Sequence, residues 1–201
     1  MYAQILIAAS LVVAGYSDVR ERAVADLVWI PGAAGVVLAL VLLPSSTLFL
    51  LVRLALIGVV GFVFARYGSI GEADAIAFVI AASDPYPISP IPIFLATGVF
   101  ALLHIGYLYL RGFVGKSMTI PVEQFKAEAR WIPKAIVSGE ARTDVDKNVN
   151  VSREEVEKSA PAGSMIEVQY GVPTVAYVAM GYLIYLAYML IFHFQLFVSL
   201  A

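Results

Sequence analysis

The sequence contains no cysteine and only two histidines, and these shortages exclude several kinds of site. Without cysteine the chain has no disulfide, no thiolate nucleophile and no cysteine-ligated zinc site. His104 and His193 both lie inside apolar stretches, where we expect them to hydrogen-bond between helices or to face lipid headgroups. We therefore expect no metal and no organic cofactor. No surface typical of nucleic-acid binding is evident, so we expect no nucleic-acid partner.

Charge is also scarce. Of the 201 residues, 14% are charged and 61% are hydrophobic, and the mean hydropathy is +0.86. This composition lies far from that of soluble globular proteins. Because a chain inside lipid must satisfy its own backbone hydrogen bonds, the composition predicts an all-α polytopic membrane protein with the lipid bilayer as its surroundings.

Long apolar runs are separated by short polar connectors, and one polar interval is much longer than the rest. The pattern predicts a membrane domain formed by residues 1–110 and 171–201, with a small cytoplasmic insert of mixed structure at residues 111–170 before the last helix. The first run has neither a basic start nor a cleavage site of small residues, so we interpret it as a retained helix and not as a signal peptide. We expect six transmembrane helices, over residues 1–16, 27–43, 48–65, 74–82, 91–110 and 172–199.

The long polar interval carries two weaker patterns. Apolar residues at helical spacing predict an amphipathic helix on the membrane surface, formed around Val122, Phe125, Ala129 and Ile132 beside Trp131. Residues 148–152 and 166–170 alternate between apolar and polar side chains, which predicts short strands.

The basic residues predict an orientation. With six spans, the connectors on one side hold Arg20, Arg22, Arg66 and Arg111, whereas the other side has only Arg53, inside a helix. Cytoplasmic loops carry an excess of lysine and arginine. We therefore expect the first set of connectors to be cytoplasmic, both termini to be external, and the protein to reside in the plasma membrane.

Two acids interrupt the apolar pattern on the cytoplasmic side. Asp18 ends the first run, and Asp74 opens the fourth run after Gly68 and Gly71. A carboxylate at or inside a bilayer boundary is energetically expensive and marks a functional site by default. Glycines just before Asp74 favour a sharp turn and a flexible connector, so we interpret Gly68 and Gly71 as a hinge.

Two neighbouring carboxyls have a specific chemistry. They do not both ionise easily, so they share a proton and titrate as a pair. One can act as base on a water molecule while the other, protonated, polarises a peptide carbonyl. The pair therefore predicts peptide hydrolysis without a covalent intermediate, and its place at the membrane edge favours a membrane-anchored helix as substrate.

Asp18-Val-Arg-Glu-Arg at the end of the first run and Gly71-Glu-Ala-Asp74 at the start of the fourth carry a resemblance. With the six runs and the late polar insert, they resemble the archaeal preflagellin peptidase and prepilin peptidase family of GxGD-type aspartic proteases. The resemblance implies a cytoplasmic endopeptidase activity that removes the short basic leader of pilin-like or archaellin precursors. By position, Asp18 and Asp74 would be the two catalytic aspartates.

The sequence departs from that pattern in places. Ala73 stands where the motif has glycine, and Ile76 stands where relatives often have a basic residue. The bacterial branch has a cysteine-rich insert and an N-methyltransferase activity, so without cysteine we expect peptidase activity alone. Acids near the pair would attract a basic leader, and we interpret Glu21, Asp26 and Glu72 as leader contacts.

Other functions use the same residues. Paired intramembrane acids also serve proton-coupled transporters, which would need further polar residues along a path across the membrane. A non-catalytic pilus or archaellum assembly scaffold would tolerate loss of either aspartate. Taken singly, Asp18 could pair with Arg20 or Arg22, and Asp74 could simply stabilise the start of its helix.

Overall fold

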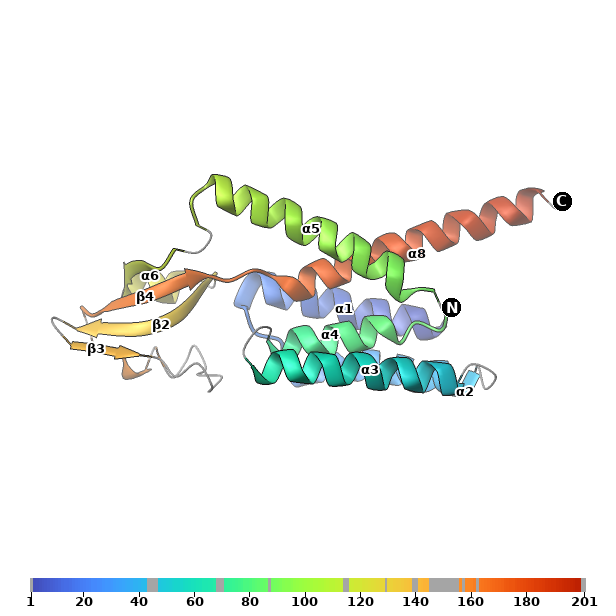
Figure 1. Cartoon of the computed structure of the whole chain (residues 1–201), viewed down its shortest axis with the longest axis horizontal. Helices are drawn as coiled ribbons and strands as arrows, with labels where there is room; N and C mark the ends of the chain where they lie inside the picture. Colours follow the sequence, from blue (N-terminus) through green and yellow to red (C-terminus); the bar gives the residue numbers. More distant parts are fainter. Residues whose placement is uncertain are drawn as a thin grey trace.

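The computed structural model describes residues 2–42, 47–67, 71–86, 88–113, 116–128, 130–138, 141–144, 156, 158–161 and 163–199. Within these residues, long apolar helices form a bundle and a small sheet lies beyond one end of it (Figure 1). The bundle helices are α1 (Tyr2–Glu21), α2 (Ile30–Leu42), α3 (Thr47–Arg66), α4 (Glu72–Ala82), α5 (Pro90–Leu110) and α8 (Thr174–Ser199). A short 3₁₀ helix, η1 (Asp26–Trp29), leads into α2.

The bundle helices differ in length. Four of them, α1, α3, α5 and α8, are long and apolar enough to cross a membrane. The other two are α2, with 13 residues, and α4, with 11 residues. At about 1.5 Å per residue, α4 reaches only about half of a hydrocarbon core of about 30 Å. The expected count of six full spans is therefore not confirmed, and the fold is a helical bundle with four membrane-spanning candidates.

Small residues bring the helices of the bundle close together. A Cβ added to Gly15 of α1 would lie 3.0 Å from the Cα of Ala176 on α8, and one added to Gly61 of α3 would lie 3.2 Å from the Cβ of Ala75 on α4. Such close approach is typical of packing between membrane helices. The core combines these contacts with buried side chains, which include Ile7, Leu11, Ile80, Ile93, Val178 and Tyr182.

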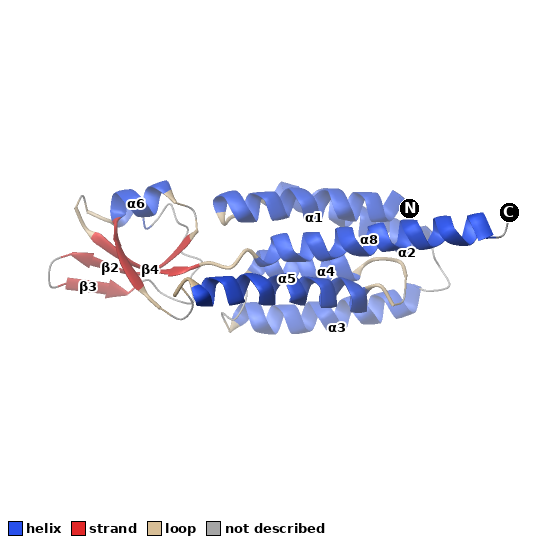
Figure 2. Cartoon of the chain, turned by 90° about the horizontal axis from the view of Figure 1, so that it is seen from above, coloured by secondary structure: helices blue, strands red, loops and turns tan. Residues whose placement is uncertain are grey.

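The insert has its own core. Its antiparallel sheet has the order β1-β4-β2-β3, formed by β1 (Met118–Pro121), β2 (Trp131–Ser138), β3 (Ala141–Asp144) and β4 (Met165–Tyr170), and helix α6 (Val122–Ala127) lies against it (Figure 2). The strand expected at residues 166–170 is confirmed, whereas residues 148–152 and Ala129 lie outside the described part of the chain.

The amphipathic helix expected on the membrane surface is wrong in length and in place. It ends at Ala127, and both Trp131 and Ile132 belong to a strand. Val122 and Phe125 are buried in the core of the insert, where they pack with residues of the sheet. The apolar residues at this spacing belong to two elements, α6 and β2, whose side chains pack in the same core.

The directions in which the helices run bring Asp18 and Asp74 to the same end of the bundle. α1 begins and α8 ends at the end of the bundle away from the sheet (Figure 1). The last turn of α1 and the first turns of α4 and α8 consequently lie at the end that faces the sheet. Asp18 and Asp74 belong to these turns.

A fully buried acid, Asp84, lies just after α4. Its carboxylate has no exposed surface. Its two oxygens accept hydrogen bonds from donors on α1, on α8 and in its own loop: Gln4 Nε2 (3.0 Å), Tyr182 Oη (3.0 Å), Tyr185 Oη (3.1 Å) and the Tyr86 N–H (3.0 Å). Arg53 of α3 donates to the Asp84 and Tyr86 carbonyl oxygens. Because its carboxylate is fully hydrogen-bonded, we assign Asp84 a structural role that joins α1, α3, α4 and α8.

Candidate functional site

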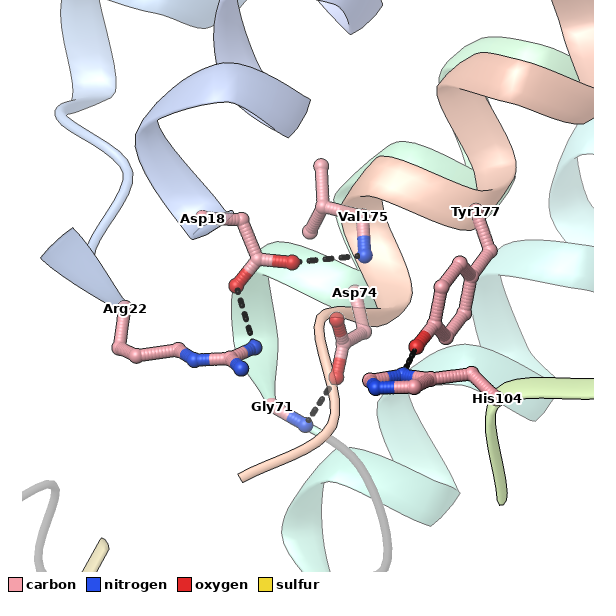
Figure 3. A network of polar contacts seen from close by, with 7 residues as sticks. All are labelled: Asp18, Arg22, Gly71, Asp74, His104, Val175 and Tyr177. Carbon is pink, nitrogen blue, oxygen red and sulfur yellow. Dashed lines mark hydrogen bonds and ion pairs between the residues drawn. The ribbon is translucent and has the colours of Figure 1, made fainter. Parts of the chain in front are cut away.

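Asp18 lies in the last turn of α1 and caps the first turn of α8. Its Oδ2 accepts a hydrogen bond from the Val175 N–H over 3.1 Å (Figure 3), and the Ala176 N–H also stabilises the carboxylate. The first N–H groups of a helix lack partners within the helix, and the positive end of its dipole favours an anion. The N-terminus of α8 therefore stabilises the ionised form of Asp18.

Arg22 follows the end of α1 and turns back toward Asp18. Its φ of 55° lies in the left-handed region, and its N–H donates to the Asp18 carbonyl oxygen over 3.2 Å. A left-handed residue often ends a helix, although glycine usually occupies this position. The turn brings Nη1 of Arg22 to 3.9 Å from Oδ1 of Asp18, with only 13% of the arginine side chain exposed.

Asp74 lies in the first turn of α4, outside the four long membrane helices. Its Oδ2 accepts a hydrogen bond from the Gly71 N–H over 3.0 Å. Burial raises the pKa of the Asp74 carboxyl from 3.8 to about 6, and the negative charge of Asp18 adds to this, while the hydrogen bond from Gly71 acts in the opposite direction. The two carboxyls, far apart in the sequence, thus lie within electrostatic reach of each other (Figure 3).

The expected motif residues have different roles in this structure. Gly71 has φ −74° and ψ 157°, an extended conformation that any residue adopts, so the backbone at this residue does not require glycine. Its small size matters instead, because an added Cβ would lie 3.3 Å from Oδ2 of Asp74. Ala73 packs against the core of the bundle, and Gly68 lies outside the described residues.

Two residues not singled out for the site complete the cluster. The hydroxyl of Tyr177 on α8 is hydrogen-bonded to Nδ1 of His104 on α5, so the interhelical hydrogen bond expected of His104 is confirmed. Tyr177 also lies within electrostatic reach of Asp18 and Arg22. Tyrosines are abundant throughout this chain, so the residue type alone does not single out Tyr177. The only signal in the sequence is its position one helical turn inside α8. The side chain of His193 is outside the described part.

The three acids interpreted as leader contacts are all exposed at the same end of the bundle. Glu21 ends α1, Asp26 begins η1 and Glu72 begins α4, two positions before Asp74. Their charges therefore lie at the end of the bundle that holds Asp18 and Asp74. This placement matches a surface that attracts cations.

The described residues contain no group of three or more histidine or acidic side chains that could hold a metal ion. The chemistry that these side chains offer is proton transfer by two carboxyls beside a guanidinium, a phenol and an imidazole.

No family model, curated protein or solved structure matches the chain. The functional argument therefore depends on the geometry of this site.

Proposed function

We propose that the protein is a membrane aspartic endopeptidase that removes the short basic leader from pilin-like or archaellin precursors at the cytoplasmic face. The observation that carries the proposal is the meeting of Asp18 and Asp74 at one end of the bundle, in unequal environments. Carboxyl pairs in different surroundings divide into an acid and a base.

The surroundings assign these roles. Asp18 is stabilised as a carboxylate by the α8 N-terminus and by Arg22, so it is the base. Asp74 is half-buried and has neither of these contacts, and its pKa is raised to about 6, so we assign it as the acid. Asp18 takes a proton from water as the water oxygen attacks the peptide carbonyl carbon, and Asp74 gives its proton to the carbonyl oxygen. When the tetrahedral intermediate collapses, Asp18 gives its proton to the leaving nitrogen and Asp74 regains one.

The distribution of charge supports the orientation and the substrate. Arg20, Arg66 and Arg111 all lie at the helix ends that face the sheet, so by the positive-inside tendency we place this end in the cytoplasm and both termini outside. In this topology the first turn of α4, with Asp74, lies at the cytoplasmic boundary, and the rest of α4 extends only part of the way across the bilayer. The exposed acids Glu21 and Glu72 beside the site would attract a basic leader.

A proton-coupled transporter would need polar groups between Asp74 and the buried Asp84 at the far end of α4. The buried side chains that α4 presents between them are apolar: Ala77, Ile80, Ala81 and Ala82. This part of the helix offers no proton relay, so the geometry supports the peptidase more strongly.

The test is cleavage of a pilin-like precursor by the purified protein in detergent. We expect wild type to shorten the precursor, and Asp18→Asn and Asp74→Asn each to abolish cleavage while remaining folded. Glu123→Gln, which removes an exposed carboxylate from α6, is the matched control and should cleave normally. Wild-type rates in either aspartate variant would rule out the two-carboxyl mechanism. An absence of cleavage by wild type and by both variants alike would favour a scaffold.

A further inference from the structure

The side chain of Arg22 is mostly shielded from solvent but incompletely hydrogen-bonded. Its Nε and Nη1 are shielded from solvent and have no hydrogen-bond partner among the described residues. The nearest ion pair, from Nη1 to Oδ1 of Asp18, is 3.9 Å long, which exceeds the length of a hydrogen bond. Buried charged donors are almost always paired, so two such donors in one side chain indicate that an acceptor binds there.

The backbone adopts an unfavourable conformation to place this arginine. Among the described residues, Arg22 is the one non-glycine residue with a positive φ. Glycine would accept this conformation without strain, but it would bring no side chain back toward Asp18. Strained residues persist where the surrounding structure requires them, and they cluster at functional sites.

Arg22 is also electrostatically central in the cluster. Its positive charge acts on the two carboxyls, Asp18 and Asp74, and on the His104 and Tyr177 pair. Figure 3 shows its guanidinium pointing toward the Asp18 carboxylate, on the side of the cluster where Gly71 precedes α4. An acceptor bound to Arg22 would consequently lie beside both reacting carboxyls.

Charge balance indicates the kind of acceptor. In the form that starts the proposed reaction, with Asp18 ionised and Asp74 protonated, the guanidinium of Arg22 makes the cluster neutral. An added carboxylate would leave an uncompensated negative charge in a buried site, which is costly. A peptide carbonyl oxygen is neutral and can accept two hydrogen bonds.

We propose that Arg22 is a third catalytic residue, which donates from Nε or Nη1 to the carbonyl oxygen of the scissile peptide bond. This inference rests on the proposed peptidase function. Arg22 and the protonated Asp74 donate to the same oxygen as the water attacks. Arg22 then stabilises the negative charge that develops on this oxygen before Asp74 completes its proton transfer. Donors aimed at developing charge contribute mainly to kcat.

The experiment measures kcat and KM for precursor cleavage by wild type, Arg22→Gln and Arg22→Lys. We expect Arg22→Gln to lower kcat by about 100- to 1000-fold with KM changed less than about 3-fold, since removal of a single oxyanion donor has effects of this size. Arg22→Lys keeps the charge without the planar group and should recover part of the loss. Arg20→Gln is the matched control, because Arg20 is exposed against Tyr16, and it should cleave normally.

The thermal midpoint of each variant, measured in the same detergent, separates catalysis from structure. Because Nε and Nη1 of Arg22 have no hydrogen-bond partner among the described residues and the ion pair to Asp18 is long, Arg22→Gln should keep a midpoint close to that of wild type. A lower midpoint that accounts for the lost activity, or a raised KM with an unchanged kcat, would overturn the catalytic assignment. If Arg22→Gln cleaves normally and Asp18→Asn does not cleave, the role of Arg22 is wrong but the two-carboxyl function stands. If Asp18→Asn cleaves, the two-carboxyl function itself is wrong.

Discussion

The carboxylate of Asp18 accepts a hydrogen bond from the backbone N–H of Val175 over 3.1 Å, across 157 residues of sequence. One side chain therefore ends the first helix of the bundle and caps the last. α8 begins only three residues after β4 ends at Tyr170, and the Gly171 N–H is bonded to the Arg130 carbonyl oxygen over 2.9 Å. The position of Asp18 is thus connected to the insert through the start of α8.

This cap predicts different stabilities for two substitutions of Asp18. Asp18→Ala removes the acceptor and should lower the free energy of unfolding by about 1 kcal/mol, the usual cost of losing a helix cap. Asp18→Asn keeps an amide oxygen for the Val175 N–H and should retain most of that stability, although both variants lose cleavage. Thermal unfolding in detergent measures the difference. Equal destabilisation by both substitutions would show that the charge, and not the hydrogen bond, provides the cap.

The raised pKa of Asp74 predicts a pH dependence of stability. The folded protein binds more protons than the unfolded chain between pH 3.8 and about 6. The stabilising contribution is therefore complete below about pH 4 and is lost as the pH rises through about 6, by at most about 3 kcal/mol. Asp74→Asn cannot ionise, so its thermal midpoint should fall less than that of wild type between about pH 5 and about pH 8.

Glu72→Gln is the control for this measurement, since Glu72 is two residues away and exposed. Its midpoint should follow wild type across the same pH range. If Asp74→Asn also follows wild type, Asp74 titrates at an ordinary value and the assignment of Asp74 as the acid is wrong.

The helices and the two acids were predictable from the sequence because each depends on residues that are close together. A long apolar run specifies a helix in lipid by itself, and an acid that interrupts such runs is conspicuous. The boundaries were less accurate. The first helix continues past its expected end at residue 16 to Glu21, so that Asp18, expected at the helix end, lies within its last turn.

The surroundings of the acids were not predictable, because they come from tertiary contacts. A backbone N–H such as that of Val175 has no sequence signature, and the left-handed turn at Arg22 occurs at a residue type that rarely adopts it. Periodicity also failed around Trp131, where two elements share one core. The short length of α4 was visible in the sequence, since the eight apolar residues that follow Asp74 are too few to span a bilayer as a helix.

The buried Asp84 predicts a large loss of stability at the end of the bundle away from the sheet. Asp84→Ala leaves four donors without an acceptor, two of them the buried hydroxyls of Tyr182 and Tyr185. Each unsatisfied buried group costs about 1 to 3 kcal/mol, so we expect this variant to fold poorly. Tyr182→Phe removes one hydrogen bond and should cost about 1 kcal/mol in thermal unfolding. A change of Asp26, which is exposed, to asparagine should leave the midpoint unaltered.

The close contact at Gly15 predicts that the site forms only if α1 lies close against α8. An added Cβ would lie 3.0 Å from the Cα of Ala176, a backbone atom that cannot move without shifting the first turn of α8. Gly15→Ala should therefore lower both the thermal midpoint and cleavage, despite the better helix propensity of alanine. Gly98→Ala on α5, where the added Cβ would meet nothing within 4 Å, should instead gain up to about 1 kcal/mol from that propensity. If both variants gain stability, the two helices have room to separate, and the contact does not hold Asp18 against α8.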